Sequence, residues 1–173
     1  MLDSEVENMM QEKNLGRLFM NTCCAVYIIL MLLLLYAKGI DACGFRMRAA
    51  QSQGYWQIVR RYANFELLKS VRPFLQTMRG MQLRDLIFNQ VAGNYLIFIP
   101  AGIFLPFYYR KQRKLKCFFL TSLLLILLIE ISQVLTFLGS FDVDDIQLNL
   151  AGCLTGWILF TLIRGFLHLF HIV

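Results

Sequence analysis

The sequence predicts an all-α integral membrane protein with four transmembrane helices and a long amphipathic helical segment between the first and the second. The chain has 173 residues, of which 58% are hydrophobic. The apolar residues fall into four blocks, and each is long enough to supply the ~20 helical residues that cross a bilayer. The five cysteines give no disulfide framework, and the lack of a C-x-x-C pair together with only two histidines argues against a zinc site. The four blocks are residues 18–37, 86–109, 117–138 and 146–170.

Residues 1–17 form a polar N-terminal segment, and residues 18–37 form the first transmembrane helix. This helix is predicted to be retained, because its apolar run is too long for a secretory signal and follows four acidic residues. Residues 86–173 are predicted to form a core containing transmembrane helices two to four. The second helix contains Pro100, Gly102 and Pro106, which a membrane helix tolerates where neighbouring helices satisfy its backbone. Pro100 and Gly102 are therefore predicted to be structural.

The segment 38–85 is predicted to be amphipathic and extracytoplasmic. Its apolar residues from Tyr55 to Met78 recur at spacings of mostly three or four, which favours one or two helices at the membrane interface, divided at Pro73. In this interpretation Arg60 and Arg61 contact lipid headgroups or phosphate. The alternative is a helical lid on the four spans with both arginines in solvent.

The orientation rests on the loop 110–116, in which five of seven residues are Lys or Arg. Short, strongly basic loops remain in the cytoplasm, so both termini are predicted to be cytoplasmic and the turn 139–144 to face outward. The segment 38–85 carries nine Lys and Arg residues, which opposes this orientation. The higher charge density of the short loop decides between the two.

Polar residues inside the predicted spans mark the candidate site, because such residues normally face protein, water or a ligand. Glu130 and Gln133 are three residues apart and share a helix face. Glu130 and Asn94 each lie about 12 Å from the outer end of their span and are expected to face a common cavity. For Asn94 and Asn149 the alternative is hydrogen bonding between helices.

An acidic turn leads into the fourth span. One of its aspartates is expected to cap the helix. Asp145, Asn149, Gly152 and Gly156 then form one stripe, in which the two glycines allow close approach of another helix. The aspartates, with Glu130, are also a candidate divalent cation site, because hard cations take oxygen ligands. No other cofactor is predicted. The three aspartates are Asp142, Asp144 and Asp145.

Three motifs together resemble the VanZ-like family over residues 84–160. They are GNYLIFIPAG at 93–102, IEISQ at 129–133 and SFDVDDIQLNLAG at 140–152. Upstream the chain keeps Arg61 and Asn64 but lacks a proline of the family pattern, and Gly139 stands where the family often has Arg. The resemblance implies a multi-pass protein of the bacterial cytoplasmic (inner) membrane. The founding member of that family is associated with resistance to the lipoglycopeptide teicoplanin.

Three functions compete. The first is a binding or shielding protein that engages a lipid-linked cell-wall component or the drug, so that less glycopeptide antibiotic binds at the cell surface. The second is an intramembrane enzyme that acts on a polyprenyl phosphate or glycolipid, with Glu130 as general acid or base. The third is a small proton-coupled lipid transporter, for which four spans would require an oligomer. The expected partners are membrane lipids and the cell-wall ligand; no nucleic acid is expected, since the basic residues flank spans.

Overall fold

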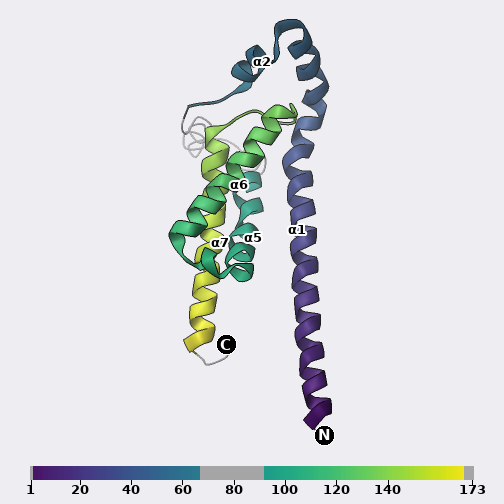
Figure 1. The fold of residues 1–173 in the computed structure, drawn as a ribbon. Helices are drawn as coiled ribbons and strands as arrows, with labels where there is room; N and C mark the ends of the chain where they lie inside the picture. The colour runs from purple at the N-terminus through teal and green to yellow at the C-terminus, as the bar shows by residue number, and fades with distance from the viewer. Residues whose placement is uncertain (1, 67–91, 170–173) are drawn as a thin grey trace, which may run out of the picture. The chain divides into compact units, whose positions relative to one another are not determined.

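The computed structural model describes residues 2–66 and 92–169, and these are almost entirely helical (Figure 1). The chain divides into two compact units, Met1–Leu34 and Leu35–Val173. Five α-helices and one 3₁₀ helix are described. They are α1 (Leu2–Gln53), α2 (Tyr55–Tyr62), α5 (Ala92–Tyr108), η2 (Arg110–Arg113), α6 (Leu115–Leu135) and α7 (Val143–Leu169).

Three helical stretches among the described residues are long and apolar enough to cross a membrane. They are Met10–Ala37 within α1, and the whole of α6 and α7. The predicted all-helical membrane class is therefore confirmed, but the predicted count of four spans is not. The helix that corresponds to the second predicted span, α5, has 17 described residues, and residues 86–91 of that span lie outside the described part.

The first unit is part of one helix with an apolar surface. Large side chains such as Leu18, Phe19 and Ile29 are exposed along it. Such a surface is unfavourable in water but matches lipid tails, which are as apolar as leucine. The Thr22 hydroxyl donates to the Leu18 carbonyl oxygen at 2.9 Å, so this polar group is satisfied within the helix.

Helix α1 does not end near residue 37, where the first predicted span ends, but continues to Gln53. No proline interrupts this stretch, and the helix stops where Gly54 adopts a φ of 93°. Part of the predicted segment 38–85 is therefore the end of α1. Helix α2 follows and is amphipathic, with Ile58 buried while Trp56 is exposed. The expected break at Pro73 falls outside the described residues.

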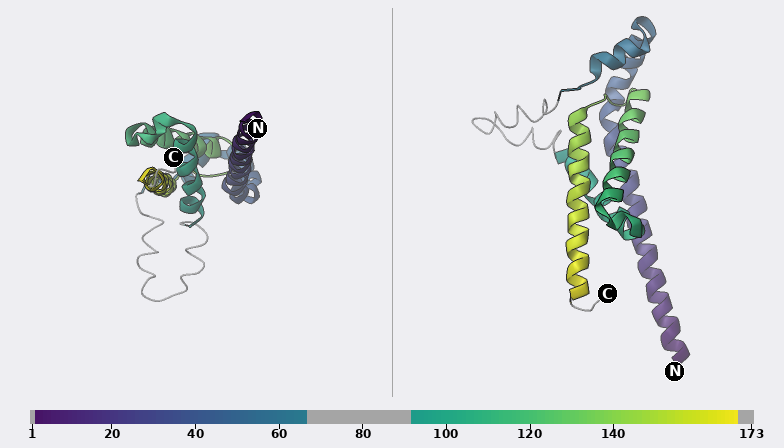
Figure 2. Two further views of the ribbon diagram at one scale, coloured as in Figure 1. Left: turned by 90° about the horizontal axis from the view of Figure 1, so that it is seen from below. Right: turned by 60° about the vertical axis from the view of Figure 1, so that its left-hand side comes forward.

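Helices α5 and α7 make the most extensive helix contact in the described structure (Figure 2). Three glycines lie at this contact. A methyl group built on Gly152 would be 2.1 Å from the Tyr95 carbonyl oxygen, and one on Gly102 would be 2.1 Å from the Cys153 carbonyl oxygen. A methyl group built on Gly156 would likewise be 2.0 Å from the Ile99 carbonyl oxygen. Pro100 lies inside α5 between the first and last of these contacts.

The basic loop between α5 and α6 is fixed to the helices around it. The Trp157 indole N–H on α7 donates to the Gln112 carbonyl oxygen at 3.0 Å, and the Gln112 side chain donates to the Thr121 hydroxyl at 3.0 Å. Arg113 Nε donates to the Pro106 carbonyl oxygen at 3.3 Å. Because α6 runs from this loop to the turn before α7, the basic loop and the acidic turn lie at opposite ends of α6.

Candidate functional site: a polar pocket between α6 and α7

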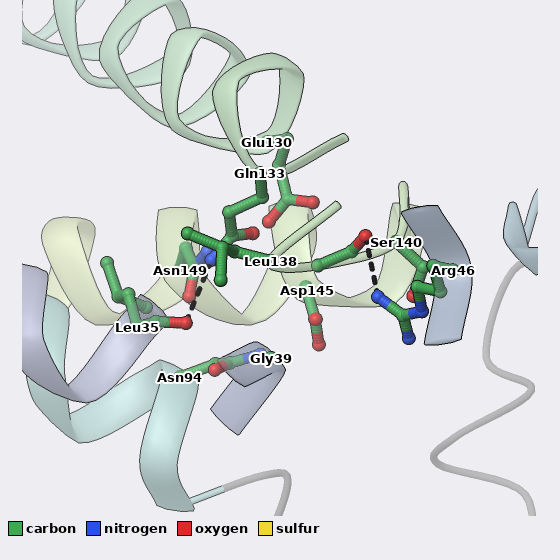
Figure 3. Close-up of a pocket in the computed structure, with 11 residues that line it drawn as sticks. Leu35, Gly39, Arg46, Asn94, Glu130, Gln133, Leu138, Ser140, Asp145 and Asn149 are labelled. Atoms are coloured by element: carbon green, nitrogen blue, oxygen red, sulfur yellow. Dashed lines mark hydrogen bonds between the residues drawn. The ribbon is translucent and has the colours of Figure 1, made fainter. Parts of the chain in front are cut away.

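A polar pocket of about 410 Å³ lies where α6 ends and α7 begins (Figure 3). This volume is within the range of small-molecule sites. Seven of its eleven lining residues carry polar or charged side chains. The lining residues are Leu35, Gly39, Arg46, Asn94, Glu130, Gln133, Leu138, Gly139, Ser140, Asp145 and Asn149.

Glu130 is the most unusual of these residues. Its side chain is only 2% exposed, and its Oε2 atom is buried without a hydrogen-bond partner. Asp142 and Asp145 are near enough for their charges to act on it. Because a buried carboxyl oxygen without a hydrogen-bond partner is costly, Glu130 is a group whose environment a ligand can complete. Figure 3 shows its carboxylate directed toward the space between α6 and α7.

Three carboxamides from three helices surround the same space. Gln133 Nε2, on α6, donates to the Leu35 carbonyl oxygen of α1 at 3.1 Å, so this side chain joins two helices. Asn149 on α7 is 1% exposed, and its Oδ1 atom is buried without a partner. Asn94 on α5 is also buried. The pocket therefore brings together Asn94, Glu130, Gln133 and Asn149 from separate motifs in the sequence.

Arg46 lines the pocket, and the sequence analysis missed it. Its Nη1 donates to the carbonyl oxygens of Phe137 and Gly139, at 3.3 and 2.9 Å, and its guanidinium lies 4.9 Å from the centre of the Tyr62 ring. The available signal was spacing: residues 35, 39 and 46 share one face if α1 is continued beyond residue 37. Arg60 and Arg61 on α2 are exposed instead and are not among the described residues of the pocket.

The acidic turn is organised by Asp142, which caps α7. Its Oδ1 atom accepts hydrogen bonds from the Asp144 backbone N–H and from Asn64 Nδ2, both at 2.9 Å. The Asn64 backbone also pairs with this turn: its N–H donates to the Phe141 oxygen at 2.7 Å, and its oxygen accepts from the Val143 N–H at 3.2 Å. Asn64 therefore pairs with the acidic turn, although the chain lacks the proline that the family pattern has near this position.

The three aspartates have different positions. Asp142 belongs to the cap, Asp144 is 1% exposed, and Asp145 lines the pocket. Among the described residues, no group of three or more His, Cys, Asp or Glu side chains is arranged to hold a metal ion. The arrangement of this part of the chain thus gives no support to the predicted cation site.

A family model described as VanZ/LLP1 matches residues 24–164. The chain belongs to the VanZ-like family. Searches of curated proteins and of solved structures gave no match. In this VanZ-like membrane protein, every described pocket residue, from Leu35 to Asn149, lies inside the matched range.

Proposed function

We propose that this VanZ-like protein binds the polar part of a lipid-linked cell-wall component, or of a lipoglycopeptide antibiotic, in the pocket around Glu130. Binding there lowers the amount of teicoplanin-type drug at the cell surface. The observation that supports this proposal is a buried Glu130 with an unpartnered carboxylate oxygen at the wall of a 410 Å³ polar pocket. A helix that only anchors a protein has no use for such a group.

The proposal requires the orientation that the charge density of the short basic loop favours. The basic loop at the start of α6 stays in the cytoplasm of a bacterium by the positive-inside rule. The pocket, near the other end of α6, then opens on the cell-wall side of the cytoplasmic membrane. With α5 as the fourth crossing, both termini are then cytoplasmic. A cell-wall ligand and an externally added drug both reach that side.

The test is surface binding of a fluorescent teicoplanin to intact cells that express the full chain. Cells with the wild-type protein are expected to bind less drug than cells without it, and Glu130→Gln is expected to restore binding. Gln147→Ala is the matched control, because Gln147 is an exposed residue of α7 outside the pocket lining. Equal drug binding with and without the abundant wild-type protein would overturn the proposal.

An intramembrane enzyme is the second candidate, and the same Glu130 supports it. A carboxyl group positioned beside a pocket is suited to act as general acid or base on a polyprenyl phosphate or glycolipid. The two functions separate in a turnover assay with such lipids in proteoliposomes. Turnover that Glu130→Gln abolishes, with the protein still folded, favours the enzyme. Turnover that survives this substitution excludes Glu130 as the acid or base.

Proton-coupled lipid transport is distinguished by its energy source. Glu130 would be the proton site, so transport activity should collapse when an uncoupler dissipates the proton gradient. Activity that persists in the uncoupled membrane excludes this mechanism.

A further inference from the structure

The chemistry of the pocket wall restricts the ligand more narrowly than the proposed function does, and the inference drawn from it rests on that function. Two polar atoms of the pocket residues are buried and unpartnered: Glu130 Oε2 and Asn149 Oδ1. The amide oxygen of Asn149 is an acceptor, and so is the Glu130 oxygen in the ionised carboxylate; the two side chains are 1% and 2% exposed. Since a buried acceptor without a donor is costly, the complementary ligand group must donate hydrogen bonds.

Charge selects among the possible donors. Glu130 has the carboxylates of Asp142 and Asp145 near it, so a group that carries positive charge suits this side of the pocket better than a neutral hydroxyl group. An ammonium group supplies both the charge and three N–H donors.

The pocket also has a cationic side. Arg46 lines it, and only its Nη1 is used in the two bonds to the carbonyl oxygens of Phe137 and Gly139. Stacking on Tyr62 orients the guanidinium further. A guanidinium held in this way is suited to a phosphate, because it presents several donors in a fixed plane. Figure 3 shows Arg46 and Glu130 as separate parts of the wall.

We infer that the pocket binds a zwitterionic lipid headgroup, with a primary ammonium at Glu130 and Asn149 and a phosphate at Arg46. The shared chemistry is that of phosphoethanolamine. It occurs as a lipid headgroup and as a free molecule, and the experiment separates these two sources.

The experiment uses the full chain in nanodiscs of phosphatidylglycerol with one test lipid, and measures by native mass spectrometry which lipid is retained. The test lipids are phosphatidylethanolamine, its mono- and dimethyl derivatives, and phosphatidylcholine. This series keeps the positive charge and the phosphate while the number of N–H donors falls to zero. Retention is expected to fall at each methylation. Equal retention across the series overturns the inference.

Substitutions locate the binding within the pocket. Glu130→Gln is expected to weaken the retention of phosphatidylethanolamine about 30-fold. This factor corresponds to ~2 kcal/mol, the lower end of the range measured when one partner of a buried charge pair is removed. Arg46→Lys keeps the positive charge but loses the planar set of guanidinium donors, so it should weaken the retention of all four test lipids by the same factor. Arg60→Gln, which changes an exposed side chain of α2 outside the pocket lining, should leave the retention of every test lipid unchanged. If Arg60→Gln matches Glu130→Gln, the lipid is held at the surface and the inference fails.

Free phosphoethanolamine distinguishes the two sources. Competition by the soluble compound, but not by phosphocholine, shows that the headgroup alone is recognised, whereas retention without competition shows that the acyl chains are also required. With either result, the inference holds only if retention also falls at each methylation of the headgroup. Methylation-dependent retention with unchanged drug binding in cells would refute only the proposed function. Drug shielding without any methylation effect would refute only this inference.

Discussion

Adding one methyl group at Gly152 should separate α5 from α7 and disturb the pocket. The methyl group of Gly152→Ala would lie 2.1 Å from the Tyr95 carbonyl oxygen. A relaxed carbon–oxygen contact needs about 3.3 Å, so the helices must move apart by about 1 Å. Overpacking of this kind costs about 1–3 kcal/mol. The same substitution gains about 1 kcal/mol in helix propensity, which hides part of the cost.

Gly165→Ala separates the two effects. Gly165 lies on the same helix, and a methyl group there has nothing within 4 Å. This variant should therefore be stabilised by about 1 kcal/mol. Because the propensity gain is common to both variants, the difference in unfolding free energy between Gly165→Ala and Gly152→Ala equals the packing cost of about 1–3 kcal/mol.

The assay is unfolding of the full chain in mild detergent by titration with sodium dodecyl sulfate, followed by circular dichroism. Gly152 lies one turn from Asn149, and its contact Tyr95 is adjacent to Asn94, so Gly152→Ala should also weaken ligand binding in the pocket. Equal stability of the two alanine variants would refute this reasoning, since it would mean that α5 does not contact α7 at Gly152.

The other predictions use the same titration. Asn64→Ala and Asp142→Ala should each lower the free energy of unfolding by about 1–2 kcal/mol. Because the two side chains share a hydrogen bond, the double variant should lower it by about 1 kcal/mol less than the sum of the two single losses. Full additivity would contradict this hydrogen bond. Arg46→Gln removes two bonds to backbone oxygens and should cost about 2 kcal/mol, whereas exposed Arg60→Gln should stay within about 0.5 kcal/mol; similar losses would contradict the placement of Arg46. Trp157→Phe deletes the N–H donor to the basic loop and should cost about 1 kcal/mol; no loss would mean that this bond is not formed.

The sequence was sufficient for two of the apolar helices, α6 and α7, and for much of the pocket. The ends of α6 and α7 lie within three residues of the predicted spans, because charged and polar segments interrupt the hydrophobic runs there. Helical spacing was also enough to place Glu130 and Gln133 on one face, and both line the pocket with Asn94. These features depend on local periodicity, which a single sequence records.

Features that depend on tertiary contacts could not be predicted. Helix α6 ends early because Phe137, rather than Gly139, adopts the left-handed conformation, with φ of 58°. Phe137 is held there by packing on the Tyr55 ring, with ring centres 4.9 Å apart. Similarly, Arg46 belongs to the pocket only because α1 continues past residue 37 as a helix. The strained turn has no signature in the adjacent residues, whereas the helix extension is indicated by the absence of a proline before Gly54 and by the spacing of residues 35, 39 and 46.

The central claim is that the pocket opens on the cell-wall side, and cysteine labelling tests it most directly. Ser140, which lines the pocket, and Lys114, in the basic loop, are each replaced by cysteine in a chain lacking the five native cysteines. Intact cells are then treated with a membrane-impermeant maleimide. We predict that Ser140→Cys is labelled in intact cells and that Lys114→Cys is labelled only after permeabilisation. The reverse pattern would place the pocket in the cytoplasm and contradict the proposed function.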